Sequence, residues 1–139
     1  MVQLARRRLR WFGGRAAVVQ SDGSMRLAFD DGSFDRFVAT YVLDLLSPHD
    51  ARELLAEARR VLQPEGRLCV ASLTHGRAGT GHLATEIWDW VAPRHPLLTG
   101  GCHPIELLEL LPGSAWTIDY RRVITAHWVP SELLVARPR

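Results

Sequence analysis

Short apolar runs alternate with a longer helical stripe along this chain. Ala16–Gln20, Phe34–Tyr41 and Leu68–Leu73 are apolar runs of strand length, and the last two are apolar on both faces. Between them, apolar residues recur at helical spacing on one face: Ala51, Leu54, Leu55, Ala58, Val61 and Leu62. The pattern predicts strand, helix and strand in direct succession, which is the βαβ crossover of a parallel sheet.

Strong local signals mark both ends of the central helix. Ser47 can cap its first turn, Pro48 suits the first helical position, and Asp50 stands where a capping box places its acid. Pro64-Glu65-Gly66 is expected to end the helix and turn the chain into the next strand.

The second half of the chain predicts two more helices and a β-hairpin. Helices are expected over Thr80–Val91 and Pro104–Leu111, with irregular backbone between them. Trp116–Trp128 and Glu132–Arg137 are expected to pair as antiparallel strands around a turn at Pro130-Ser131. The fold class is therefore α/β: a Rossmann-like three-layer sheet of about five strands, mostly parallel, with a C-terminal antiparallel hairpin.

Composition fits one globular domain spanning 1–139. The chain is 47% hydrophobic and 23% charged, without repeats or low-complexity tracts. Its formal net charge of +2 is far from the excess of a dedicated nucleic-acid binder, so no nucleic-acid partner is expected. No run approaches the ~18 apolar residues of a membrane span, so no membrane partner is expected. Cys69 lies inside an apolar strand, which favours a reducing compartment and a cytoplasmic location.

An arginine-rich segment opens the chain. Apolar residues of Met1–Phe12 fall on one helical face, and four arginines occupy much of the rest. Such a face can bind nucleic acid or anionic lipid, or can simply be a solvated helix surface. We favour the solvated surface.

Two motifs in order carry a family resemblance. They are Asp31-Gly32-Ser33-Phe34-Asp35 and the run Arg60 to Leu68, RVLQPEGRL. With the matching helix between them, the chain resembles the class I S-adenosylmethionine-dependent methyltransferases of the small-molecule, type-11-like branch. The C-terminal hairpin resembles the strand pair that closes that family's sheet.

The resemblance implies a cofactor site for S-adenosylmethionine. Asp22 and Gly23 match the positions that contact the adenine ring, where a carboxylate can accept from the exocyclic amino group. Ala39, Thr40 and Tyr41 match the positions that line the methionine and ribose side. Catalysis in the family rests mostly on positioning, so no catalytic residue is assigned from the motifs.

The family's glycine-rich loop and the acid that binds the ribose hydroxyls have no counterpart here. The chain resembles the family from the helix before its third strand, so the first two family strands are expected to be missing. We expect cofactor binding by a monomer to be weak or lost. An incomplete reading of the gene, with the loop encoded upstream, is an open alternative.

The missing strands would leave one edge of Phe34–Tyr41 bare. An exposed apolar edge favours association. We therefore expect either a rearranged sheet, in which Ala16–Gln20 pairs with Phe34–Tyr41, or a homodimer formed through this edge. A non-catalytic interaction module with the same fold is the alternative to an impaired methyltransferase.

The loop-rich segment after Leu73 is a candidate substrate pocket. The resemblance places it on the cofactor side of the sheet, where side chains could line a pocket for a small-molecule acceptor: Trp88, Trp90, His95, Thr99 and His103. Core packing of the tryptophans and capping by His103 are equally compatible with the sequence. The histidines lack the spacing of a zinc site, so no metal is expected.

Overall fold

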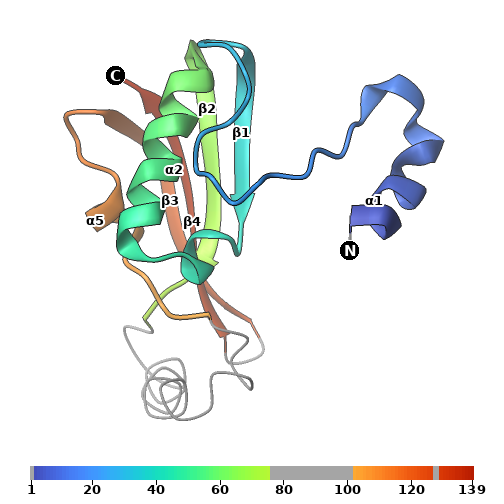
Figure 1. The fold of residues 1–139 in the computed structure, drawn as a ribbon. Helices are drawn as coiled ribbons and strands as arrows, with labels where there is room; N and C mark the ends of the chain where they lie inside the picture. The colour runs from blue at the N-terminus through green and yellow to red at the C-terminus, as the bar shows by residue number, and fades with distance from the viewer. Residues whose placement is uncertain (1, 76–101, 127–128) are drawn as a thin grey trace.

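The computed structural model describes residues 2–75, 102–126 and 129–139 (Figure 1). The elements are, in chain order, α1 (Val2–Leu9), η1 (Arg10–Arg15), β1 (Phe34–Thr40), η2 (Leu43–Leu45), α2 (Pro48–Val61), β2 (Leu62–Leu73), α5 (Leu107–Leu110), β3 (Trp116–Ala126) and β4 (Val129–Pro138). The candidate helix Thr80–Val91 lies outside the described residues, as do Trp88, Trp90, His95 and Thr99.

The strands form one mixed sheet in the order β1-β2-β4-β3. β1 and β2 are parallel, and α2 connects them, so the predicted βαβ crossover is confirmed. β4 lies antiparallel to β2 and to β3, which gives the expected C-terminal hairpin. The α/β fold class is therefore confirmed, with the hairpin closing one side of the sheet.

The strand expected at Ala16–Gln20 does not form. The described sheet has four strands instead of about five. One of its three strand pairs is parallel and two are antiparallel, whereas the sequence predicted a mostly parallel sheet. Figure 1 shows the segment between η1 and β1 leading away from the sheet toward α1. The rearranged five-stranded sheet is thus wrong, and the outer edge of β1 has no partner strand in the described part of the chain.

Two expected turns lie inside strands. Pro64-Glu65-Gly66 belongs to β2, where the ladder to β1 jumps from Phe34↔Leu62 to Arg36↔Arg67, so the turn becomes a bulge. A Cβ on Gly66 would lie 2.9 Å from the carbonyl oxygen of Gln63, which explains the glycine. Pro130 and Ser131 belong to β4 and pair with Thr125 and Ile124.

The core lies on one face of the sheet. Leu55 and Ala58 of α2 pack with Leu107 of α5 and with Leu68 and Leu134 of the central strands. None of the described helices buries a residue on the opposite face, so the third layer expected from sequence is not formed by the described residues; α1 has no buried residue. No described helix is long and apolar enough to cross a membrane.

The start of α2 follows the predicted capping box. The Ser47 hydroxyl accepts from the Asp50 backbone N–H at 3.1 Å and donates to the Asp50 carboxylate at 2.8 Å. Pro48 is the first helical residue. The helix therefore begins directly beyond the carboxyl end of β1, which brings its first turn to the same edge of the sheet.

Arg60 anchors the loop before β1 to the end of α2. Its guanidinium donates to the carbonyl of Phe29 at 2.8 Å and to the carboxylates of Asp31 and Glu57, each at 2.5 Å. The Gly32 N–H returns a bond to the Arg60 carbonyl at 2.9 Å. This clasp joins the two sequence motifs physically, and it fixes where β1 begins.

Candidate functional site

Buried polar side chains gather at the carboxyl ends of β1 and β2. In open α/β sheets this edge is where ligands bind. We call the group the strand-end cluster, and it consists of the buried Asp44, Ser72, Ser131 and Glu132 together with Tyr41, which is 48% exposed. At the lower end of the sheet in Figure 1, β1 ends and α2 begins.

Tyr41 has an unusual backbone conformation. Its φ is +52°, whereas the other positive φ angles among the described residues belong to glycines. A left-handed conformation is unfavourable for a residue with a Cβ, and such strain concentrates at functional sites. The Tyr41 N–H donates to the Ala71 carbonyl at 2.7 Å, and its hydroxyl lies 3.0 Å from the Ser131 hydroxyl. The side chain therefore reaches across the end of β2 to β4.

Asp44 is a fully buried carboxylate with incomplete hydrogen bonding. Its exposed fraction is 0%, and its Oδ1 accepts from the Ser72 hydroxyl at 3.3 Å. Its Oδ2 has no hydrogen-bond partner among the described residues. Buried carboxylate oxygens normally have partners, so an orphaned one points to a ligand or to a functional role. The nearby Cys102 thiol has its pKa raised by burial, with the charge of Asp44 adding to the effect, so it stays protonated.

Glu132 ties the hairpin to α5. It is fully buried, and it accepts from the Leu107 N–H at 3.3 Å and from the Arg121 guanidinium. Glu132 faces Ser72 across the β2–β4 ladder, so the two buried groups share a face of the sheet. Arg121 also lies 3.9 Å from the carboxylate of Glu106, which extends the network to the start of α5.

The segment before α5 lies against the strand ends. The His103 N–H donates to the Asp44 carbonyl at 3.0 Å, and the Ile105 N–H donates to the Leu73 carbonyl at 3.0 Å. The predicted pocket residue His103 therefore lies beside the strand-end cluster, with its backbone bonded there and its side chain half-buried.

Asp22 and Gly23 lie apart from this cluster. The Asp22 carboxylate accepts from the Ser24 N–H at 2.9 Å, a local turn, and Gly23 has φ +94°. The residues that follow line a shallow hollow against the outer side of α2, with Ser24 and Arg26 opposite Glu53. The resemblance implied one site for both sets of residues. Ala39 and Thr40 instead pair with Val70 and Ala71 of β2, and Tyr41 reaches Ser131 in the strand-end cluster.

The sequence prediction missed Asp44, Ser72, Ser131 and Glu132. A signal for Asp44 exists, because an acid inside the run Val42-Leu43-Asp44-Leu45-Leu46 directly after a strand is a candidate buried charge. Glu132 has a similar signal beside the apolar residues of the last strand. The two serines have none, since their roles depend on residues distant in sequence.

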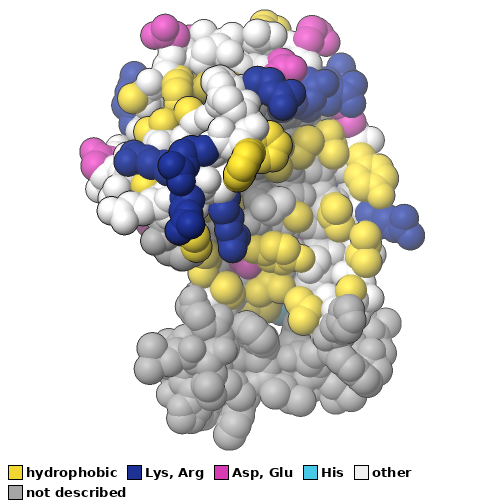
Figure 2. Space-filling model, turned by 90° about the vertical axis from the view of Figure 1, so that its right-hand side faces the viewer, with side chains coloured by type: hydrophobic (Ala, Val, Ile, Leu, Met, Phe, Trp, Pro, Cys, Tyr) yellow, Lys and Arg dark blue, Asp and Glu magenta, His cyan; other side chains and the backbone are white. Residues whose placement is uncertain are grey.

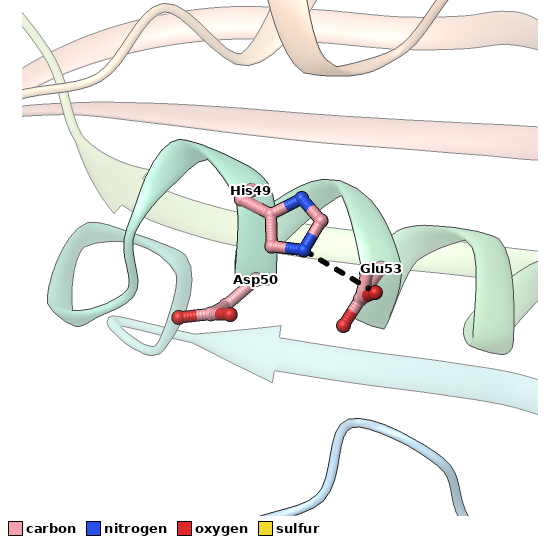
Figure 3. A group of neighbouring side chains, drawn as sticks. All are labelled: His49, Asp50 and Glu53. Atoms are coloured by element: carbon pink, nitrogen blue, oxygen red, sulfur yellow. Dashed lines mark ion pairs between the residues drawn. The ribbon is translucent and has the colours of Figure 1, made fainter.

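A group of potential metal ligands lies at the start of α2. Single ligand atoms of His49, Asp50 and Glu53 fall within 4.8 Å of one another. Figure 3 shows His49 directed at Glu53, with Nε2 and Oε1 3.4 Å apart, while Asp50 lies to the side. The Asp50 carboxylate is engaged by Ser47. These contacts belong to the helix start, and we assign no metal role to them.

Comparisons with known proteins identify the family. The sequence profile of a family described as "Methyltransferase domain" matches residues 1–70. No curated protein sequence matches the chain at a significant level.

Solved structures share the fold. The chain aligns over 98% of its length with a structure from Methanosarcina mazei described as SAM-dependent methyltransferases, at 20% identity and a TM-score of 0.70, covering 76% of that chain. It aligns over 99% of its length with a Pyrococcus horikoshii protein, at 17% identity and a TM-score of 0.69, and the alignment covers 66% of that protein. It aligns over 98% of its length with the [4+2]-cyclase SpnF, at 19% identity and a TM-score of 0.67, and the alignment covers 61% of that protein. The chain thus spans less than two thirds of the length of the last two.

Proposed function

The chain belongs to the methyltransferase domain family, and we propose that it transfers a methyl group from S-adenosylmethionine to a small-molecule acceptor. The profile match carries this proposal, because it covers β1, α2 and most of β2. It includes Tyr41 and Asp44 of the strand-end cluster, whereas Ser72, Ser131 and Glu132 lie beyond the matched residues. The fold alone would not suffice, since SpnF, a [4+2]-cyclase, shares it. We take 1–139 to act as a single domain, and we propose a cytoplasmic location, because Cys69 lies inside the apolar strand β2 and forms no disulfide within the described part of the chain.

The strand-end cluster fits the methionine end of the cofactor. The orphaned Oδ2 of Asp44 is an acceptor suited to a positively charged group, such as the ammonium of the methionine part. Ala39, Thr40 and Tyr41 would line this end, as the family resemblance implies. When bound, S-adenosylmethionine supplies an electrophilic methyl group on its sulfonium sulfur.

The adenine end is less well supported. Asp22 accepts from the Ser24 N–H with Oδ1, which leaves Oδ2 as the oxygen that could accept from the adenine amino group, but the residue lies apart from the strand-end cluster. The chain also contains no G-x-G-x-G sequence, the loop that lets backbone approach a nucleotide closely. We therefore propose that a single copy of this chain binds the cofactor weakly and that methyl transfer is impaired.

The residues of the cluster have distinct proposed roles. Tyr41, fixed by its bond to Ser131, orients the wall of the site at the end of β1. Asp44 accepts a hydrogen bond from the ligand, and Ser72 holds its other oxygen in place. His103, with Trp88, Trp90 and His95, is proposed to border the acceptor. No residue is assigned as a general base, because positioning can supply most of the rate.

Calorimetry with S-adenosylhomocysteine tests the cofactor proposal. We expect binding in the range of about 0.1–1 mM, which corresponds to roughly 4–5.5 kcal/mol. Asp44→Asn should weaken it about tenfold, whereas Asp50→Asn, on the neighbouring helix cap, should leave it unchanged. Absence of heat at millimolar ligand from the folded protein would overturn the proposal, and equal loss in both variants would reject the role of Asp44.

A second candidate function is a non-catalytic interaction module that forms a homodimer. The outer edge of β1, which has no partner strand among the described residues, favours it, because unpaired backbone groups template strand addition. Val38 on this strand is 65% exposed, and Figure 2 shows hydrophobic side chains gathered on the face seen from the β1 side. We propose that two copies pair along β1.

Sedimentation of two lysine variants tests the dimer. Val38→Lys places a charge on the proposed interface and should shift the protein to monomer, because a charge on an edge opposes strand pairing. Val123→Lys, on the opposite edge strand β3, is the matched control and should leave the dimer intact. A monomeric wild-type protein, or equal effects of both variants, would reject pairing through β1.

A further inference from the structure

An arginine-rich segment lies apart from the sheet. It consists of α1 and η1, residues 2–15, and we call it the arginine arm. Neither element has a buried residue, and Figure 1 shows both standing away from the sheet. The arm is therefore a surface that the core of the described chain does not use.

A stretch without helix or strand joins the arm to the folded core. It runs from Ala16 to Arg26, and the chain is fastened to α2 from Leu27, whose N–H donates to the Glu57 carboxylate at 2.8 Å. A tether of about eleven residues can span roughly 35 Å when it is extended. The arm can thus lie on an external surface while the sheet stays folded beside it.

The arm carries positive charge alone. The first acid of the chain is Asp22, which lies beyond the arm. None of the arm's arginines forms an ion pair with a described residue. They are Arg6, Arg7, Arg8, Arg10 and Arg15. The face turned toward the viewer in Figure 2, where the arm lies, shows basic side chains gathered beside hydrophobic ones. This charge is complementary to an anionic partner.

Large apolar side chains of the arm are exposed as well. Trp11 is 92% exposed, Leu4 51% and Phe12 50%. Tryptophan is highly buried on average in folded proteins, so this exposure is unusual. The sequence alone favoured a solvated helix surface, whereas the exposed Trp11 indicates a surface that contacts an apolar partner.

Apolar and cationic side chains fall on different sides of the arm. Val2, Ala5 and Leu9 are half-buried along one side, whereas Arg6 and Arg10, four residues apart, are exposed along another. Basic residues on one side and Trp, Phe and Leu on the other are typical of a helix that lies in a membrane interface. A nucleic-acid surface would use the arginines and the aromatic rings, but the aliphatic residues would contribute little to it.

From this arrangement we propose that the arginine arm binds the surface of a bilayer that contains anionic phospholipid. The guanidinium groups contact headgroup phosphates, and Leu4, Trp11 and Phe12 enter the boundary between headgroups and acyl chains. The contact is peripheral, and it requires no membrane-spanning helix. The proposal does not depend on methyl transfer, because it uses no residue of the strand-end cluster.

Co-sedimentation of the full chain with lipid vesicles tests this proposal. The protein should bind vesicles of equal parts phosphatidylcholine and phosphatidylglycerol at least about tenfold more tightly than vesicles of phosphatidylcholine, because arginines near an anionic surface are attracted to it. Raising the salt concentration from about 0.1 M to about 0.5 M should weaken binding severalfold, since salt screens this attraction. Absence of binding to the anionic vesicles, or equal binding to both kinds, would overturn the proposal.

Paired charge variants locate the contact. Arg6→Gln/Arg10→Gln should weaken binding to the anionic vesicles at least about tenfold. Arg67→Gln/Arg122→Gln removes the same charge from exposed positions of β2 and β3, and it is the matched control. The control should bind within about threefold of the wild type, because the attraction falls off within a Debye length of the surface. Equal weakening by the two double variants would reject the arm as the contact.

A second pair of variants tests the apolar contact without changing charge. Trp11→Ser should weaken binding to the anionic vesicles by about tenfold, whereas Tyr120→Ser, at a 48% exposed position of β3, should bind as the wild type does. Because the substituted side chains are exposed, the circular dichroism spectrum should stay unchanged. Equal binding by Trp11→Ser and the wild type would overturn the proposal.

A labelled single-stranded RNA examines the nucleic-acid alternative with the same proteins. We expect the protein to bind this RNA at least about tenfold more weakly than it binds the anionic vesicles. Tighter binding to the RNA than to the vesicles, lost in Arg6→Gln/Arg10→Gln, would assign the arm to nucleic acid and overturn the lipid proposal.

Discussion

Tyr41 is the residue where backbone geometry departs most from the ordinary. Its φ of +52° costs about 1–2 kcal/mol for a residue with a Cβ. The bonds to Ala71 and Ser131 hold it there, so the surrounding structure maintains the strain. A strained residue at the end of a parallel strand, beside an orphaned carboxylate, supports the choice of this edge as the ligand site.

Glycine and alanine substitutions measure this strain. Both Tyr41→Gly and Tyr41→Ala remove the side-chain contacts, but only glycine tolerates positive φ, so Tyr41→Gly should be more stable by about 1 kcal/mol. At Thr40, which continues the extended strand, the order should reverse, with alanine more stable than glycine by about 0.5–1 kcal/mol. Urea unfolding gives both differences. The same order at both positions would show that Tyr41 is not strained.

Among the elements, α2 does the most to organise the molecule. Its first turn lies at the strand-end cluster, its middle packs on the core, and its last turn holds the loop before β1 through Arg60. Glu57 completes the clasp by accepting from the Leu27 N–H at 2.8 Å. The hydrogen bond from Arg60 lowers the pKa of Glu57 from 4.5 to about 2, and Arg60 has its own pKa raised by Glu57 and Asp31.

This lowered pKa predicts the pH dependence of the clasp. Because the folded-state pKa lies below the unfolded value, the contribution of Glu57 to stability is complete above about pH 4.5 and is lost as pH falls toward 2. Glu57→Gln should lower the free energy of unfolding by about 1.5–3 kcal/mol at pH 7. The difference from wild type should shrink steadily between pH 4.5 and 3 in urea titrations.

A neighbouring glutamate provides the control. Glu53 is exposed on the same helix, and its ion pair among the described residues is with His49, so Glu53→Gln should change stability by less than about 0.5 kcal/mol. If the effect of Glu57→Gln were the same at pH 3 and pH 7, the carboxylate would not be the group that Arg60 holds.

For the whole molecule, local signals in the sequence predicted the helix and strands of the βαβ unit, whereas contacts between residues distant in sequence form the strand-end cluster. Ser47, Pro48 and Asp50 mark the start of α2 through residues three apart, and apolar runs mark β1 and β2. The Tyr41–Ser131 contact joins residues 90 apart, and the Ser72–Asp44 bond joins residues 28 apart. No local pattern contains such pairs.

The strand expected at Ala16–Gln20 failed for the same reason. Its apolar pattern suits a strand, but a strand needs a partner edge, and the described contacts anchor the following residues Leu27–Asp31 to α2. The result is a sheet in which the outer edge of β1 has no partner strand among the described residues, and in which one face is not covered by a described helix. The local sequence pattern predicted the fold class, but it did not predict how many strands the sheet contains.

Hydrogen–deuterium exchange with and without millimolar S-adenosylhomocysteine tests the central claim most directly. The claim is that the strand-end cluster binds the methionine end of the cofactor. We predict slowed exchange in peptides covering Tyr41–Leu46 and Leu73–Thr74, with no change in β3. Binding that leaves these two segments unprotected, with protection confined to another part of the chain, would contradict the account.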